Sequence, residues 1–195
     1  MSLSAVVQLF DSYQKQPAIA VPVEFLLNGM RIEPVRKEGA QFILSNLDAG
    51  KYIINIKTQI FFPEIFEFDV SQSQVLADQV YIRHLIPCPL YPYTKGTTLL
   101  RGMVKSAKDM NPLSGVSVTL NYSGFRGKHK STSTQTYNLG AYDGRYALSI
   151  AGKHQAMFDL NVEFSKAGFQ TVHHQVSIEN GFTHFLDTNL NPSRE

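Results

Sequence analysis

Apolar and polar residues alternate along much of this chain, as they do in β-strands that bury one face. The clearest case is FDLNVEF, residues 158–164, in which the two kinds of residue follow each other without a break. Residues 66–70 and 175–178 repeat the alternation. The pattern indicates that strands dominate the fold.

Applied to the whole chain, the same pattern predicts six strands in the first half and seven in the second. We expect them at about 5–10, 20–27, 40–46, 51–58, 64–70, 78–85, 99–105, 115–122, 131–138, 144–150, 157–165, 170–178 and 183–190. Residues 72–78 are a candidate for one helical turn, but no amphipathic helix is evident. The dipeptides Asn28-Gly29 and Asp143-Gly144 favour tight hairpin turns. Short, regularly spaced strands of this kind are typical of a β-sandwich.

The two halves of the chain resemble each other. A proline and two valines at positions 17, 21 and 23 are matched 95 residues later, at positions 112, 116 and 118. Residues 50–56 resemble residues 144–150, at a spacing of 94. Two distant sets of matches at nearly one spacing indicate an internal duplication.

The boundary between the halves is marked by proline. Residues 87–96 contain three prolines and a glycine, and proline has no backbone N–H to give to a sheet. We therefore expect a first domain at residues 1–86, a proline-rich linker at 87–98 and a second domain at 99–195. The fold class is all-β, with two tandem Ig-like or transthyretin-like β-sandwich domains.

The second half carries a series of short motifs: Gly102-x-Val104, PLSGVSVTL at 112–120, DGRYAL at 143–148 and VEFSKAGF at 162–169. This series resembles the carboxypeptidase regulatory-like domain, and the first half resembles a diverged copy. The resemblance implies a transthyretin-like (prealbumin-like) sandwich with an accessory role and no active site of its own. Within it, Tyr146 is expected to bury its ring and leave its hydroxyl at the solvent.

Composition and charge narrow the classes of partner. The chain has 18 basic and 16 acidic residues, a net charge of +2 that is too small for a nucleic-acid-binding surface. No apolar run approaches the roughly 18 residues that a membrane-spanning helix needs, so no membrane insertion is expected. The first residues lack the features of a secretion signal. We expect a cytoplasmic protein, or one exported within a particle.

No catalytic, cofactor-binding or metal-binding motif is found. Phosphate-binding loops, paired cysteines, metalloprotease motifs and nucleophile elbows are all absent from the sequence. His173 and His174 are adjacent in a strand, so their side chains should point to opposite faces. Glu67 and Asp69 are expected on a solvated strand face. Cys88 lies between two prolines and is expected to be a small apolar residue of the linker. We expect no enzyme.

Two features are candidate partner-binding sites. One is the basic loop that contains Arg126, Lys128 and Lys130, because loops at the ends of sandwiches often bind ligands; the alternative is a flexible hairpin arm. The other is Phe61-Phe62, where one ring is a candidate surface anchor. The alternative for this pair is a corner of the core.

These observations favour a structural or adaptor protein that makes protein–protein contacts in a multi-subunit or homo-oligomeric assembly, such as a phage tail or contractile-injection particle. A carbohydrate- or surface-binding module is the first alternative, and a glycan partner is left open. A small transthyretin-like hydrolase is the second, although no residue pattern supports it.

Overall fold

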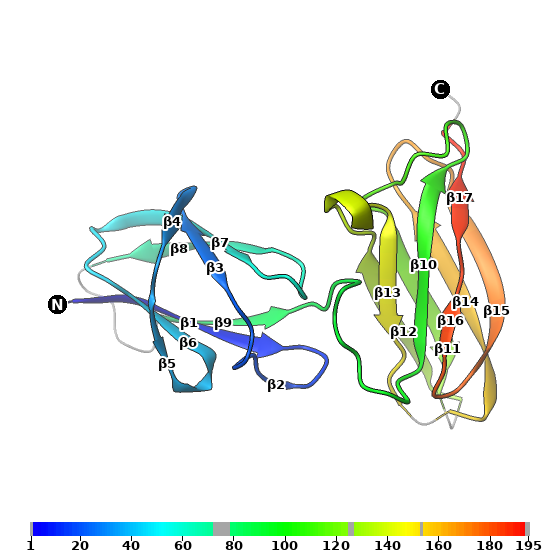
Figure 1. Ribbon diagram of the computed structural model, residues 1–195, viewed down its shortest axis with the longest axis horizontal. Helices are drawn as coiled ribbons and strands as arrows, with labels where there is room; N and C mark the ends of the chain where they lie inside the picture. Colours follow the sequence, from blue (N-terminus) through cyan, green and yellow to red (C-terminus); the bar gives the residue numbers. More distant parts are fainter. Residues whose placement is uncertain (1, 72–78, 125–126, 153, 194–195) are drawn as a thin grey trace. The chain divides into compact units, whose positions relative to one another are not determined.

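The computed structural model describes residues 2–71, 79–124, 127–152 and 154–193. The chain divides into two compact units, Met1–Tyr91 and Pro92–Glu195, and Figure 1 shows that each is built of two layers of strands. The described residues form strands and short 3-10 turns, which confirms the all-β prediction of two tandem sandwiches. The helical turn considered for residues 72–78 lies outside the described part of the chain.

The first unit packs a five-stranded sheet against a four-stranded sheet. The five-stranded sheet contains β1 (Leu3–Asp11), β2 (Gln16–Pro17), β5 (Val35–Lys37), β6 (Gln41–Ser45) and β9 (Val80–Leu85). The four-stranded sheet has the order β4 (Met30–Ile32), β3 (Glu24–Leu27), β7 (Gly50–Lys57) and β8 (Glu64–Val70). A 3-10 turn, η1 (Glu38–Ala40), joins β5 to β6.

The second unit has the same plan. One sheet places β10 (Leu99–Ser106) between β13 (Arg145–Ser149) on one side and β16 (Thr183–Phe185) and β17 (Thr188–Leu190) on the other. The other sheet has the order β12 (His129–Gln135), β11 (Ser117–Ser123), β14 (Met157–Ser165) and β15 (Val172–Glu179). A 3-10 turn, η3 (Gly140–Tyr142), precedes β13.

The alternation in the sequence becomes alternate burial in each strand. In β14, Leu160, Val162 and Phe164 are buried in the core of the second unit, and the polar residues between them face outward. In the first unit, the rings of Phe25 and Phe42 lie 4.7 Å apart and join the two sheets. Burial of these apolar faces is the main favourable term in the folding of each unit.

Most predicted strands are confirmed to within a few residues of their ends, and β2, β4 and β5 are additional short strands. The turn at Asn28-Gly29 is confirmed, since the residues have φ of 49° and 83° and join β3 to β4. Asp143-Gly144 is a correction, because these residues follow η3 and do not form a two-residue hairpin. A β-carbon on Gly144 would lie 2.7 Å from the Val104 carbonyl oxygen, so packing favours glycine there.

The predicted last strand is split into β16 and β17. At the break, the hydroxyl of Tyr146 donates a hydrogen bond of 2.6 Å to the carbonyl of Leu186. The carboxylate of Asp187 accepts a hydrogen bond of 2.8 Å from the N–H of Met103. The expectation of a solvated Tyr146 hydroxyl was therefore wrong, because the interrupted strand supplies an acceptor. Burial raises the pKa of this hydroxyl well above its usual value.

The second set of matches between the halves is also corrected. β1 runs antiparallel to β6 and parallel to β9, as β10 does to β13 and to β16 and β17. By position in its sheet, β7 therefore corresponds to β14, and β13 corresponds to β6. The matched residues 50–56 and 144–150 lie in strands of different position. Their shared glycine, basic residue and tyrosine mark the start of a strand and do not identify its place.

The boundary between the units falls at Tyr91 and Pro92, within the segment predicted as a linker. Residues 87–91 pack against the first unit. The buried Cys88 donates its backbone N–H to the carbonyl of Ile60 over 3.0 Å, and the Tyr91 hydroxyl donates a hydrogen bond to Asp11. Burial and the Asp11 carboxylate raise the pKa of Tyr91 well above its usual value.

Candidate functional site

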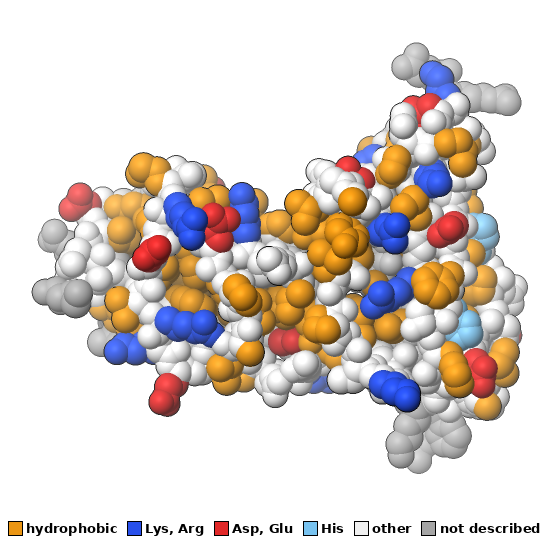
Figure 2. Space-filling model, viewed as in Figure 1, with side chains coloured by type: hydrophobic (Ala, Val, Ile, Leu, Met, Phe, Trp, Pro, Cys, Tyr) orange, Lys and Arg blue, Asp and Glu red, His pale blue; other side chains and the backbone are white. Residues whose placement is uncertain are grey.

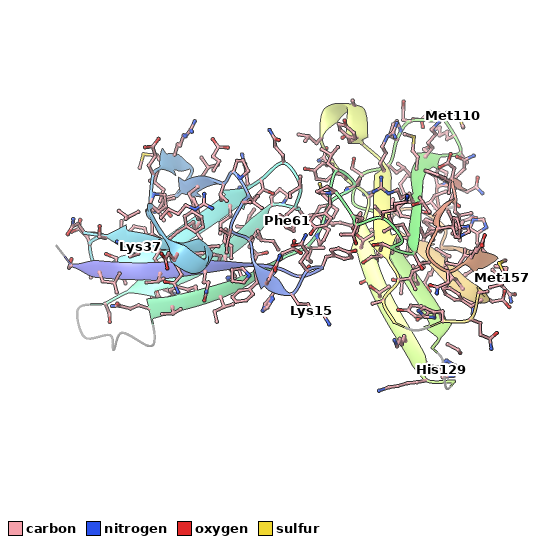
Figure 3. All side chains as sticks on the ribbon, turned by 60° about the horizontal axis from the view of Figure 1, so that its bottom comes forward. Lys15, Lys37, Phe61, Met110, His129 and Met157 are labelled. Carbon is pink, nitrogen blue, oxygen red and sulfur yellow. The ribbon has the colours of Figure 1, made fainter. Side chains whose placement is uncertain are left out.

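Phe61 and Phe62 lie between β7 and β8 and are both buried, with 0% and 9% of their surface exposed. The Phe61 ring, labelled in Figure 3, lies 5.3 Å from the ring of Tyr91. Its backbone N–H donates a 2.9 Å hydrogen bond to the hydroxyl of Thr58. Neither ring is therefore a surface anchor, and the core corner is the alternative that the structure supports.

The basic loop joins β11 to β12. Arg126 lies outside the described residues. Lys128 is exposed, and its carbonyl accepts a 2.9 Å hydrogen bond from the N–H of Gly124. Lys130 is half-buried, and its ammonium donates a 3.3 Å hydrogen bond to the carbonyl of Ala151 in the loop between β13 and β14. Lys130 is thus engaged within the unit, and Lys128 is left to the solvent.

Beside this loop lies a groove of about 810 Å³ in the second unit. Its lining comes from three places: the side chains of the sheet β12-β11-β14-β15, the β11–β12 hairpin, and the segment that leads into β14. The lining residues are Asn121, Tyr122, Ser123, Gly124, Gly127, His129, His154, Gln155, Met157, Phe158, Asp159, Asn161 and Ser177. Figure 3 labels His129 and Met157, which come from β12 and β14.

The floor of the groove is polar because β11, β14 and β15 alternate strictly. Asn121 lies directly opposite Asn161, and Asp159 lies opposite Ser177. On the core side of these strands, the ring of His154 stacks on Phe158 with centroids 4.2 Å apart, and the buried Tyr122 ring meets His154 edge-on at 5.4 Å. Burial raises the pKa of the Tyr122 hydroxyl.

The five-stranded sheet of the first unit has an unusual outer side. Val35, Ile43, Val6 and Val80 are paired in register and form an apolar row across β5, β6, β1 and β9. Ile82 continues it along β9. Val35, Val80 and Ile82 are 49%, 42% and 51% exposed. We call these five residues the apolar face.

The sheet β12-β11-β14-β15 of the second unit is the opposite case. The row that crosses it consists of Ser131, Asn121, Asn161 and Gln175, paired in register. We call these four residues the polar face. Asn121 and Asn161, the two central residues of this row, also line the floor of the groove. The core-facing sides of the central strands β1, β6, β11 and β14 are apolar in both sheets, so along these strands the contrast lies on the outer surface.

The described histidines are not clustered. His173 lies 3.8 Å from the Glu163 carboxylate, while His174 Nε2 lies 2.6 Å from the hydroxyl of the buried Thr188. The predicted opposite orientation of this pair is therefore confirmed. Within the described ranges, no three His, Cys, Asp or Glu side chains are grouped so that they would hold a metal ion.

The charged side chains are dispersed. Figure 2 shows basic, acidic and hydrophobic side chains interspersed on the visible side of each unit. No helix in the described part of the chain is long and apolar enough to cross a membrane.

No family model matches the chain, and no curated protein matches it. Similar solved structures include the shaft pilin SpaA of Lactobacillus rhamnosus GG, with 9% identity, a TM-score of 0.35, and coverage of 100% of this chain and 99% of the pilin. The minor pilin GBS52 of Streptococcus agalactiae has 12% identity, a TM-score of 0.34 and 98% coverage of both chains. The Bacillus anthracis TIE protein has 11% identity and a TM-score of 0.36. That match covers 98% of this chain, which spans 34% of the TIE protein.

Sequence reasoning missed both the groove and the apolar face. The groove brings together residues of four strands and two loops, so only the register of the sheet reveals it. The apolar face did leave a signal, because residues 5–7 are Ala-Val-Val, apolar on both sides of one strand. Such a strand has a second apolar side to cover.

Proposed function

We propose that the chain is a non-enzymatic structural or adaptor subunit that joins a protein assembly through the apolar face of its first unit. The observation that carries this proposal is the in-register row from Val35 to Val80. An outer sheet side normally carries polar residues, and an exposed apolar patch marks a contact with another molecule.

The partner we propose for the apolar face is a second copy of this chain. The outward residues around the row are mostly neutral, including Gln8 and Gln41, which pair in register. Lys37 is the charged residue that the strand pairing brings to this side, opposite Gln41. Two copies can therefore face each other without strong like-charge repulsion. A two-fold contact also lets one surface serve both partners.

Burial gives this contact its free energy. A fully buried valine or isoleucine side chain contributes about 1.5–3 kcal/mol relative to an exposed one. Several such side chains on each copy supply a favourable term, which the loss of translational and rotational freedom on association partly offsets.

The proposal is tested by co-expressing a tagged and an untagged copy of the full chain and capturing the tagged one. The wild type should retain the untagged copy, and Val80→Asp with Ile82→Asp in both copies should lose it. The matched control is Ser131→Asp with Ser133→Asp, which adds the same charges to exposed positions of β12. Loss in the control as well, or retention in the apolar-face variant, would contradict the proposal.

Electron microscopy of the captured material then identifies any larger particle. A phage tail or contractile-injection particle stays a prediction, as does the place of assembly inside or outside the cell. Kinship with the carboxypeptidase regulatory-like domain is also proposed, on the motifs from Gly102 to Phe169. It accounts for an accessory role, since function resides in sites added to such folds.

A further inference from the structure

The groove in the second unit has the build of a ligand site. Its volume of about 810 Å³ lies within the roughly 300–1,000 Å³ typical of small-molecule sites. Its floor is made by side chains of β11 and β14, each of which is paired with a strand on both sides. The backbone groups of these strands are engaged in the sheet, so a ligand on the floor must be recognised by side chains.

The floor presents amides, hydroxyls and a carboxylate. An amide side chain offers both donors and an acceptor, a hydroxyl does the same, and a carboxylate accepts. Asn121, Asn161 and Ser177 therefore suit a ligand whose groups both donate and accept hydrogen bonds. Asp159 is an additional acceptor. The register fixes Asn121 against Asn161, so these groups are held at set positions before any ligand arrives.

The walls add an apolar contact. Met157 is 53% exposed at the groove, and the exposed ring of His129 also lines it. A sugar ring has this combination of properties: hydroxyls around its rim, and C–H groups on its faces that pack against apolar and aromatic side chains.

Other ligand classes fit less well. The described lining includes the Asp159 carboxylate, whose charge repels a phosphate or sulfate. A peptide strand adds to an exposed sheet edge through its backbone, whereas most of the floor lies on the central strands β11 and β14.

We propose that this groove binds a neutral saccharide, with Asn121, Asp159 and Asn161 hydrogen-bonding its hydroxyls and Met157 packing against a ring face. This site lies on the second unit and uses none of the residues of the apolar face. A result that contradicts the saccharide proposal therefore does not contradict the assembly proposal, and the reverse also holds.

The test begins with the full chain on a glycan array that carries neutral, sialylated and sulfated oligosaccharides. The neutral glycan with the strongest signal is then titrated into isotope-labelled protein and followed by NMR. Binding should shift the resonances of residues that line the groove, and Asn161→Ala or Asp159→Ala should weaken it at least about tenfold. The matched control Asn189→Ala changes an exposed amide on β17 and should bind like the wild type.

Melting temperatures of all variants separate loss of binding from loss of fold. Asn161 and Asp159 are exposed, so both variants should melt within a few degrees of the wild type. The proposal is overturned if no neutral glycan binds, if only sulfated or sialylated glycans bind, or if both groove variants bind as tightly as the control. The proposal is also overturned if an added peptide shifts resonances at the β12 edge while no glycan shifts those of the groove.

Discussion

The apolar face of the first unit and the polar face of the second unit lie on sandwiches of the same plan. Each row crosses four strands in register, yet one consists of valine and isoleucine and the other of serine, asparagine and glutamine. The inner sides of the central strands β1, β6, β11 and β14 are apolar and buried. The two sheets hold different places in the fold, since β1 corresponds to β10 and β14 to β7. The comparison shows that the core requires only one side of each strand, and that the outer side can be apolar or polar.

This contrast separates what makes the fold from what the fold presents. Substitutions on inner positions should act on stability, and substitutions on outer positions should act on association or ligand binding.

Val7 and Val6 are neighbours in β1 on opposite sides of the sheet. Val7 is 0% exposed, so Val7→Asp buries an unpaired charge and should cost about 4 kcal/mol or more, unfolding the first unit. Val6→Asp places the charge on the apolar face and should cost about 1 kcal/mol, from lower strand propensity. Urea unfolding followed by circular dichroism measures both, and equal costs would show that the outer side is also core.

Gly102 of β10 and Val7 of β1 hold corresponding places, since Gly102 pairs with Tyr146 as Val7 pairs with Phe42. The difference arises because the Leu186 carbonyl oxygen occupies the space of a side chain, 2.0 Å from where a β-carbon would stand. Gly102→Ala should therefore cost about 3 kcal/mol through overpacking. Thermal melting measures it, with Gly29→Ala as a control that has open space but positive φ. A melting temperature like that of the wild type would contradict this packing.

Tyr146→Phe removes the hydrogen bond to Leu186 and leaves a carbonyl without its donor, which should cost about 1–3 kcal/mol. Because burial raises the pKa of Tyr146, its neutral form is favoured in the folded state. The stability that comes from the buried neutral hydroxyl is complete below the unfolded pKa of about 10 and is lost as pH rises beyond it. Urea unfolding between neutral pH and pH values above about 10 should show a smaller alkaline loss in the variant than in the wild type. Parallel pH profiles would refute this role.

Lys128→Ala with Lys130→Ala should have the smallest effect on stability. Lys128 is exposed and Lys130 makes one hydrogen bond at the surface, so the pair should cost less than about 0.5 kcal/mol. If the basic loop contacts a partner, as the sequence predicts, the same variant with Arg126→Ala should weaken capture of that partner at an unchanged melting temperature. Unchanged capture would remove the loop from the candidate sites.

The fold was largely predictable because its information is local. Alternation placed β14 at its observed limits, and the turn at Asn28-Gly29 followed from two residues. The split of the last strand was not predictable, since it depends on Tyr146 reaching Leu186, 40 residues away. Matching of local motifs likewise paired residues 50–56 with 144–150, although their strands differ in sheet position.

The candidate sites were harder to predict because they depend on the register between strands. Asn121 and Asn161 look like ordinary outward residues until pairing sets them side by side. One ring of Phe61-Phe62 was a candidate surface anchor, with a core corner as the alternative, because adjacent aromatic residues point to opposite sides. The segment 87–91 packs beside Phe61, through the pairing of Phe61 with Pro87 and the ring of Tyr91, and the sequence gives no local sign of that contact.

The most direct test of the apolar face is sedimentation equilibrium of the purified full chain from about 1 to about 100 μM, a range that detects micromolar association. The wild type and the Ser131→Asp, Ser133→Asp control should show a mass that rises with concentration from 21.9 kDa towards twice that value. Val80→Asp with Ile82→Asp should stay at the monomer mass. A wild type that remains monomeric throughout, or a variant that associates as strongly as the wild type, would contradict self-association through this face.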